Sequence, residues 1–254
     1  MTTYTDGALS QIEAEYSRIA ARYRSLIEKL VVFRLTNAEA QLFMHHGVAR
    51  RLSTMNEAIK ITFSAIPPNQ DRAPTDENRS LATVGLHSHI INCYGVLDNL
   101  AHVWVNETGV TGKDGTSLMP IQVGFRKKHA IVIASLQKPL KGVLDEMHEW
   151  IEYLVSFRDS LSHRIPLYIP PYMIDPSRQE DYISAEKRKR AATSYAEYEQ
   201  LNKEIAEMHH FKAFMIHHLA TSDPIAFHAQ MIADFKTVNK LCIAVMDTLE
   251  IGRI

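Results

Sequence analysis

The sequence predicts an all-α fold, a bundle of long antiparallel helices. Apolar residues recur at steps of three and four over long segments, whereas alternation with a period of two persists nowhere. Glycine and proline number only ten each in 254 residues, which favours long uninterrupted elements. Apolar residues make up 46% of the chain, enough for a sizeable core within a single domain that spans residues 1–254.

The N-terminal half of the sequence predicts three long helices. The first carries its apolar side chains on one stripe, as a helix packed on a core does. Thr36 or Asn37 can cap the second helix, and a loop with three prolines follows it. The expected helices span residues 8–35, 37–65 and 79–108, with a loop at 66–78 and a glycine-rich turn region at 109–120.

The C-terminal half predicts further helices around one extended segment. Four prolines disfavour helix in residues 165–176, which we expect to be extended. The sequence Ser222-Asp223-Pro224 is typical of a helix start. The expected helices span 125–136, 140–161, 182–220 and 225–249, and the last two are expected to form an appended helical hairpin over about residues 180–250.

The charge balance limits the class of partner. A formal net charge of −1 argues against a protein that coats nucleic acid through bulk charge. Two basic runs, residues 126–129 and 187–190, are ordinarily solvated helix faces, and their alternative role is contact with RNA phosphates.

Several features favour a cytoplasmic protein. The polar N-terminal segment lacks a signal-peptide pattern, and no segment approaches the apolar length of a membrane span, so we expect no membrane association. Cys93 and Cys242 stand among apolar residues, which predicts buried reduced thiols.

The segment 157–166 carries a dense group of reactive side chains at the end of an expected helix. The guanidinium of Arg158 can hold a phosphate, and the imidazole of His163 can move a proton. Five residues correspond to roughly 140° of helical rotation, so this pair does not share one face. Asp159 lies four residues from His163, and Ser162 four from Arg158, so each of those pairs does share a face.

Two interpretations of this segment remain open. The ordinary one is a polar cluster that fixes the end of the helix. The functional one is RNA cleavage, in which the 2′-hydroxyl attacks the adjacent phosphate, Arg158 stabilises the negative charge and His163 acts as general base or acid. Such a reaction needs neither a metal nor a cofactor.

The spacing from Arg158 to His163 resembles the motif of the HEPN superfamily, an arginine, a polar residue, three or more residues and a histidine. HEPN domains are small helical domains, and many are metal-independent ribonucleases of toxin, defence and RNA-processing systems. Residues 92–102 resemble the helix that packs opposite the motif in HEPN-like bacterial proteins, so the resemblance covers about residues 79–172.

The resemblance implies a homodimer with one composite site. Arg158 and His163 of both subunits would then face each other across a two-fold axis, which removes the need for both to share one helix face. It also implies RNA as the substrate, with an antitoxin or regulatory protein as a further partner.

Further side chains are candidates for substrate binding. Asp98, Asn99 and His102 can orient His163 or bind a base edge, and their alternative is helix–helix hydrogen bonding. Downstream of the motif, a cation and an aromatic ring can contact a phosphate and stack on an unpaired base. These residues are Arg164 and Tyr168, and packing of the tyrosine on the proline-rich loop is the alternative.

Two other functional classes remain as alternatives. One is a non-catalytic helical dimer that binds a nucleotide or a partner protein, which Asp159 favours because its carboxylate would repel a phosphate. The other is a metal-binding bundle. No His-Glu-x-x-His pattern occurs, so we expect no metal site. The histidines in question are His45, His46, His87, His89, His209, His210, His217 and His218.

Overall fold

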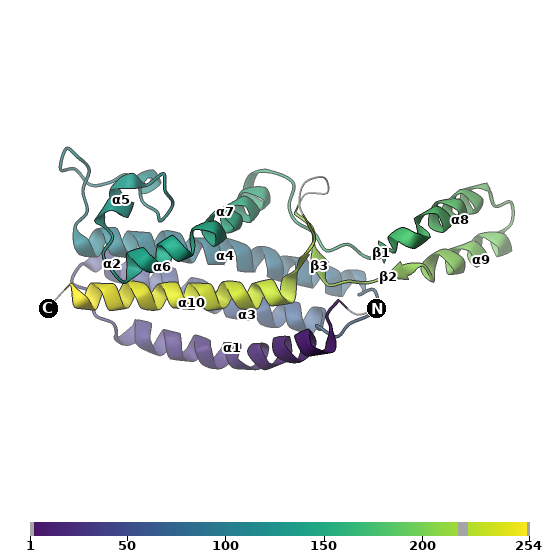
Figure 1. Ribbon diagram of the computed structural model, residues 1–254, viewed down its shortest axis with the longest axis horizontal. Helices are drawn as coiled ribbons and strands as arrows, with labels where there is room; N and C mark the ends of the chain where they lie inside the picture. Colours follow the sequence, from purple (N-terminus) through teal and green to yellow (C-terminus); the bar gives the residue numbers. More distant parts are fainter. Residues whose placement is uncertain (1–2, 218–222, 253–254) are drawn as a thin grey trace.

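The computed structural model describes residues 3–217 and 223–252 and confirms the all-α fold. An elongated bundle of long helices forms the body of the molecule (Figure 1). A π-helical segment joins α2 and α3 without a break, so these three segments form one continuous helix, the second of the bundle. The bundle elements are α1 (Asp6–Val32), α2 (Ala38–Leu42), the π-helical turn (Phe43–Val48), α3 (Ala49–Ala65), α4 (Asp76–Thr108) and α10 (Phe227–Ile251).

Side-chain hydrogen bonds cap the N-termini of the first three long helices of the bundle. The hydroxyl of Thr5 accepts a hydrogen bond from an amide of the first turn of α1, and Thr75 does the same for α4. At α2 the capping residue is Asn37, whose side-chain oxygen accepts two amide hydrogen bonds. Gly109, with a φ of 67°, ends α4 in the left-handed conformation that glycine adopts readily. The three helices expected in the N-terminal half are therefore confirmed.

The bundle interior is apolar except for a few buried polar side chains. Asp234 of α10 accepts hydrogen bonds from Trp150 Nε1 at 2.9 Å and from Gln230 Nε2 at 2.7 Å. Its second carboxylate oxygen lies 3.5 Å from Nε2 of His89, which is also buried. Cys93 and Cys242 are buried free thiols, as expected. These polar groups tie α10 to the helices around it.

A second buried histidine lies at the start of α10. The ring of His228 is fully buried, with Nε2 2.6 Å from the carbonyl oxygen of Ile66 and Nδ1 3.1 Å from the Tyr4 hydroxyl. Burial lowers its pKa to about 4. His228 therefore joins the N-terminal segment, the loop after α3 and α10 as a neutral imidazole.

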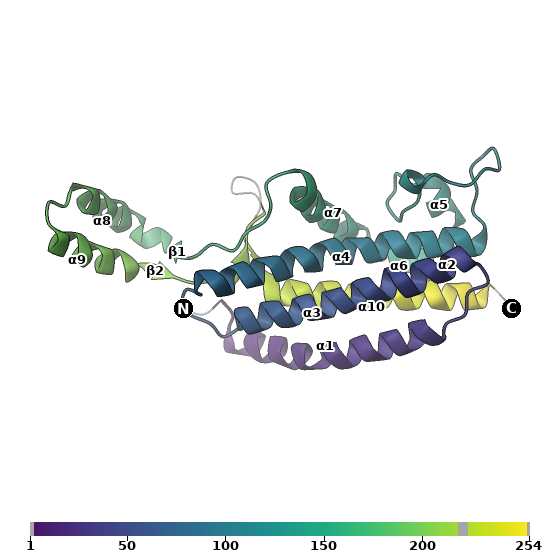
Figure 2. The same ribbon diagram turned by 180° about the vertical axis from the view of Figure 1, so that it is seen from behind.

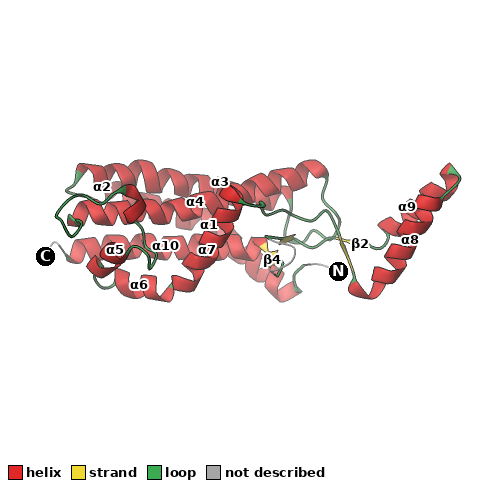
Figure 3. Ribbon diagram, turned by 90° about the horizontal axis from the view of Figure 1, so that it is seen from above, coloured by secondary structure: helices red, strands yellow, loops and turns green. Residues whose placement is uncertain are grey.

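Three shorter helices lie over α4 and α10 (Figure 3). The helix expected over 140–161 is wrong as one element, because Met147 has a φ of −91° and a ψ of 1° and breaks it. The first part packs mainly against α10 and the second against α4, so the chain bends between them. The helix expected over 125–136 is shorter than predicted. The observed bounds are α5 Ala130–Ser135, α6 Leu140–Glu146 and α7 His148–His163.

A helical hairpin projects from one end of the bundle (Figure 2). It consists of α8 (Gln179–Ala191) and α9 (Tyr195–Ala206), so the single helix expected over 182–220 is wrong. The physical reason is local, because Ser194 accepts a hydrogen bond from the Glu197 amide and starts a new helix after a turn. The hairpin therefore lies within residues 179–206, and α10 belongs to the bundle.

Short strands join the hairpin and the linker to the bundle. The segment expected to be extended, 165–176, is extended up to Asp175, which precedes a short 3₁₀ turn (Pro176–Arg178). The last helix begins at Phe227, because the two residues before it form a strand. The expected start sequence began with Ser222, which lies outside the described residues. The antiparallel pairs are β1 (Met173–Ile174) with β2 (His209–His210) and β3 (Phe214–Met215) with β4 (Ile225–Ala226). Across residues 3–217 and 223–252, no helix is both long and apolar enough to cross a membrane.

Candidate functional site on α4 and α7

Arg158 lies on the face of α7 that packs on α4. Its guanidinium carbon is 4.3 Å from the centroid of the Tyr94 ring, and Nη1 is 3.0 Å from Oδ1 of Asp159. About a quarter of the side chain remains exposed, at 27%. The contact with an aromatic face contributes on the order of 0.5–1 kcal/mol at such a site. Arg158 is therefore held in place by α4 while about a quarter of its side chain remains exposed.

Asp98 lies one turn of α4 beyond Tyr94 and interacts with cations on both sides. Its pKa is raised by burial, and the attraction of Arg158 and Arg51 opposes that shift. Burial likewise raises the pKa of the Tyr94 hydroxyl. Asp98 thus stands between an arginine of α7 and an arginine of α3, in a partly dry polar layer over α4.

His163 is the last residue of α7 and is exposed, as are Ser162 and Arg164. Within residues 3–217 and 223–252, its imidazole makes no hydrogen bond and no ion pair. Arg158 pairs with Asp159, which is part of the polar cluster expected at the helix end, and His163 is not part of that cluster. One chain therefore does not join Arg158 to His163, in agreement with their expected separation around the helix.

The three candidates on α4 face in two directions. Asp98 faces α7, whereas the next residue, Asn99, faces the π-helical turn. His102 stacks on Phe43 with 4.4 Å between the ring centroids, and burial lowers its pKa. Asp98 and Asn99 are neighbours on the helix, about 100° apart, so their side chains contact different elements.

A cavity of about 420 Å³ opens between α4 and the π-helical turn, on the other side of α4 from α7. Two glycines shape the region. A Cβ on Gly47 would lie 2.6 Å from the amide nitrogen of Asn99, and one on Gly95 would lie 2.3 Å from the guanidinium carbon of Arg51. Among the described residues, cations but no carboxylate line this cavity. The lining residues are Leu42, Phe43, His46, Gly47, Arg50, Arg51, Thr54, Asn92 and Asn99.

Arg50 and Arg51 were missed by reasoning from the sequence. Nη1 of Arg51 lies 3.3 Å from the Asn92 side-chain oxygen, and Nη2 of Arg50 lies 2.9 Å from Nδ1 of His46. The adjacent arginines after His-His-Gly were a signal, but only the tertiary contact of α3 with α4 shows that they flank Asp98 and Asn99.

Tyr168 belongs to the linker and not to the Arg158 cluster. Its backbone pairs with Ile216 in both directions, at 3.1 and 2.9 Å. The carbonyl of the preceding residue, Leu167, accepts a hydrogen bond from His87 Nε2 at 2.8 Å. The ring is 38% exposed, so the linker presents it at the surface from an anchored backbone.

A serine and a histidine meet beside the end of α7. Nε2 of His217 is 2.6 Å from the Ser160 hydroxyl and 3.0 Å from the carbonyl oxygen of Ser156. Ser160 is only 3% exposed, and the same ring nitrogen contacts the backbone of α7. The pair therefore holds the segment after β3 against α7.

The side chains of the basic run at 126–129 differ in role, because one pairs with α7 and others are exposed to solvent. Arg126 makes two contacts with the Glu152 carboxylate of α7, at 3.2 and 2.9 Å, and that hydrogen-bonded pair raises its pKa. Lys127 and Lys128 are exposed beside it, and His129 is buried. This run adds two free lysines near the Arg158 surface. The run at 187–190 lies on the hairpin, where Arg188 pairs with Glu204.

The histidines considered as metal ligands lie apart from one another. His209 stacks on Tyr172 at 3.5 Å between centroids, and His45 lies 3.2 Å from the Leu30 carbonyl oxygen. Of this set, His218 lies outside the described residues. In the described part of the chain, no three histidine, cysteine or acidic side chains converge as metal ligands would.

Comparison of the sequence with protein-family models finds no match, and searches among curated proteins and solved structures find none either. The resemblance to HEPN domains therefore stays a prediction, and the argument for function rests on the residues of α4 and α7.

Proposed function

We propose that this protein is a homodimeric, metal-independent endoribonuclease of the HEPN type, in which Arg158 binds the scissile phosphate and His163 transfers the proton. The observation that carries the proposal is the arrangement at the end of α7. Arg158 is held by Tyr94 with part of its side chain exposed, and His163 is exposed with no hydrogen bond or ion pair in the described part of its own chain.

The proposed chemistry uses two copies of α7. The 2′-hydroxyl of the RNA attacks the adjacent phosphorus, one His163 accepts the hydroxyl proton, and the bond to the 5′-oxygen breaks. The partner subunit's His163 protonates that oxygen. Arg158 stabilises the extra negative charge that the phosphate carries in the transition state.

The surroundings of Arg158 support binding of a polyanion. Arg50, Arg51 and the exposed Lys127 and Lys128 place positive charge on either side of α4. Such charges attract RNA phosphates without regard to sequence, and the attraction falls as salt rises. The chain thus has local basic surfaces despite a net charge of −1.

The test is cleavage of a labelled RNA in buffer with EDTA. We expect His163→Ala to lower the cleavage rate by about 100-fold or more, the usual contribution of a general acid or base. His148→Ala, at the other end of α7, is the matched control and should leave the rate unchanged. Full activity of the His163→Ala variant would reject the proposal.

A mixing experiment tests whether the site is composite. Arg158→Ala and His163→Ala chains should each be inactive alone. Unfolded and refolded together, they form heterodimers that still contain one Arg158 and one His163 on opposite chains, and activity should return in part. No recovery in a mixture shown to contain heterodimers would contradict a site shared between subunits.

A second candidate function is a non-catalytic dimer that binds a nucleotide or a partner protein. The ion pair of Arg158 with Asp159 favours it, because a carboxylate already lies 3.0 Å from the guanidinium. Calorimetric titration with nucleoside mono-, di- and triphosphates separates the two functions. Binding that requires Arg158, without turnover of RNA, would select this candidate.

A further inference from the structure

The groove between α1 and α10 combines an apolar end and a basic end. Two cavities lie along it, of about 460 Å³ and 390 Å³. The first is walled largely by small and apolar side chains, and the second has three cations among its eight lining residues. The first is lined by Tyr4, Ala8, Gln11, Ile12, Glu15, Ala229, Ile232, Ala233, Lys236 and Thr237.

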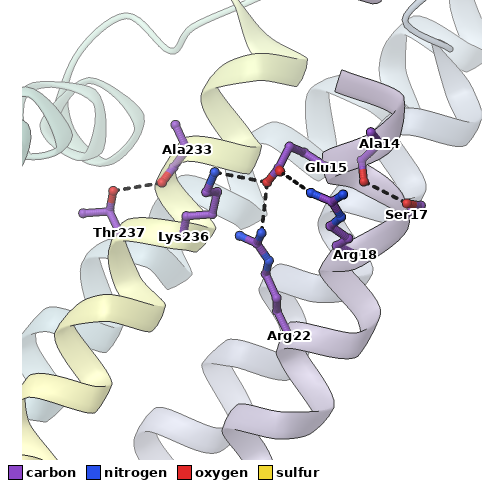
Figure 4. Close-up of polar contacts among 8 residues, drawn as sticks. All are labelled: Ala14, Glu15, Ser17, Arg18, Arg22, Ala233, Lys236 and Thr237. Carbon is purple, nitrogen blue, oxygen red and sulfur yellow. Dashed lines mark hydrogen bonds and ion pairs between the residues drawn. The ribbon is translucent and has the colours of Figure 1, made fainter. Parts of the chain in front are cut away.

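At the middle of the groove, one carboxylate is surrounded by three cations (Figure 4). Glu15 lies 3.0 Å from Arg18 Nη1, 3.2 Å from Arg22 Nη2 and 3.1 Å from Lys236 Nζ. The hydrogen bond from Lys236, and then the two arginines, lower the pKa of Glu15. One negative charge against three positive ones leaves this point of the groove electropositive.

The positive surplus continues into the second cavity. Arg18, Arg22 and Lys29 line it together with Ser25 and Asn239, and none of the described residues that line it is acidic. Arg18 is 62% exposed and Lys236 46%, so both ammonium and guanidinium groups can exchange Glu15 for another anion. The groove therefore complements an extended negatively charged partner.

We propose that the α1–α10 groove binds an acidic amphipathic helix of a partner protein. Apolar side chains of that helix enter the first cavity, where Ala8, Ala229 and Ala233 permit a close approach. Its carboxylates face the cations of the second cavity. The lining residues of α1 run from Ala8 to Lys29, a rise of about 30 Å, which matches a helix of about 20 residues.

RNA fits this groove less well than a helix. Single-stranded RNA is bound by stacking of bases on aromatic side chains in addition to phosphate contacts. Among the described residues that line the two cavities, the one aromatic ring is Tyr4, whose hydroxyl contacts Nδ1 of His228 at 3.1 Å. The apolar half of the groove thus offers no stacking platform, whereas it suits leucine-sized anchors.

The test uses the full chain and a synthetic helix. The probe is a fluorescein-labelled 20-residue peptide with leucines at i, i+3, i+4 and i+7 spacing and glutamates beside them. Fluorescence anisotropy compares it with the same peptide carrying lysine for glutamate. We expect saturable binding of the acidic peptide, at least 10-fold tighter than the basic one and weaker at high salt.

Two variants of the protein locate the binding. Arg18→Glu with Arg22→Glu reverses the charge, and Ala233→Trp fills the first cavity from an exposed position while the ion pairs remain. Each should weaken binding at least 10-fold. Arg24→Glu is the control, because it reverses one arginine on an exposed part of α1 outside both cavities. Circular dichroism verifies that each variant is folded.

Several outcomes would overturn the proposal. Equal binding of the acidic and basic peptides, or no binding of either, would do so. So would full affinity in both the charge-reversed and the Ala233→Trp variants. A labelled 12-nucleotide RNA that binds more tightly than the acidic peptide, and is lost with the same variants, would assign the groove to nucleic acid.

Discussion

In the bundle interior, Asp234 accepts hydrogen bonds from Trp150 and Gln230 and is buried, whereas on the α4–α7 surface Arg158 is held by two partners yet remains partly exposed. Both are polar residues that connect helices. The carboxylate of Asp234 is itself buried, so its loss leaves two half-buried donors without their acceptor. The surface group can exchange a protein partner for a ligand. Substitutions in the interior should therefore mainly lower stability, whereas substitutions on the α4–α7 surface should mainly weaken binding.

The largest effect on stability is expected from Asp234→Ala. Two partly buried donors would lose their acceptor, the buried His89 would lose its nearby carboxylate, and the free energy of unfolding should fall by about 4 kcal/mol. Urea denaturation followed by circular dichroism measures it. Asp234→Asn keeps one acceptor oxygen and should cost less than half as much. Equal losses in the two variants would show that the hydrogen bonds are not the cause.

The buried His228 should make the bundle sensitive to acid. Its pKa is about 4 in the folded protein against about 6.5 unfolded, so the unfolded chain binds more protons in that range. Its contribution is complete above about pH 6.5 and is lost as pH falls towards 4, a total of about 3 kcal/mol.

Urea denaturation at steps from pH 7.5 to 4 measures this loss. Burial lowers the pKa of His129 as well, so the share of His228 is taken as the difference from a His228→Phe variant. A variant that loses stability in acid as steeply as the wild type would contradict the assignment.

Replacing a glycine inside the bundle should change the free energy of unfolding more than replacing one on its surface. A Cβ on Gly85 would lie 2.3 Å from Thr62 Oγ1 and 3.1 Å from the Ala58 carbonyl oxygen, so Gly85→Ala should push α3 from α4 at about 2 kcal/mol. Gly142, in α6, has open space at that position, and Gly142→Ala should instead stabilise by about 0.5–1 kcal/mol. Thermal denaturation of both variants compares the signs.

The smallest effect on stability, with the largest on binding, is expected at Arg158. Arg158→Ala removes one surface ion pair and one contact with Tyr94, which together contribute about 1 kcal/mol or less. RNA binding in a filter assay should nevertheless fall at least 10-fold. Arg126→Ala is the matched control, since it also removes a surface pair with α7. If both variants weaken RNA binding equally, Arg158 contributes only nonspecific positive charge to binding.

The long helices of the bundle could be predicted from the sequence because the features that indicate them are local. Asn37 and Thr75 cap helices through contacts within one turn, and the apolar stripes are long. Prediction failed where packing decides. Met147 bends the chain because α6 and α7 pack on different helices, and His209 enters a strand because Met173–Ile174 pairs with it.

The candidate site was found in part for the same reason. Arg158 and Asp159 are adjacent in sequence, so their cluster was visible, and the separate direction of His163 followed from helix geometry. Arg51 was not found, because it reaches Asp98 only through the packing of α3 on α4. Nor does the sequence indicate that Asn99 faces the π-helical turn or that His102 stacks on Phe43.

The π-helical turn at Phe43–Val48 holds one residue more than an α-helical turn would. Deleting one residue there would restore α-helix and shift the residues within the turn by one position, while α2 and α3 keep their present directions. Phe43 would leave the ring of His102, and Gly47 would no longer lie beneath Asn99. The turn therefore behaves as a one-residue insertion absorbed within a helix. In an alignment of relatives, a single-residue gap at this point would mark the proteins that lack the cavity beside α4.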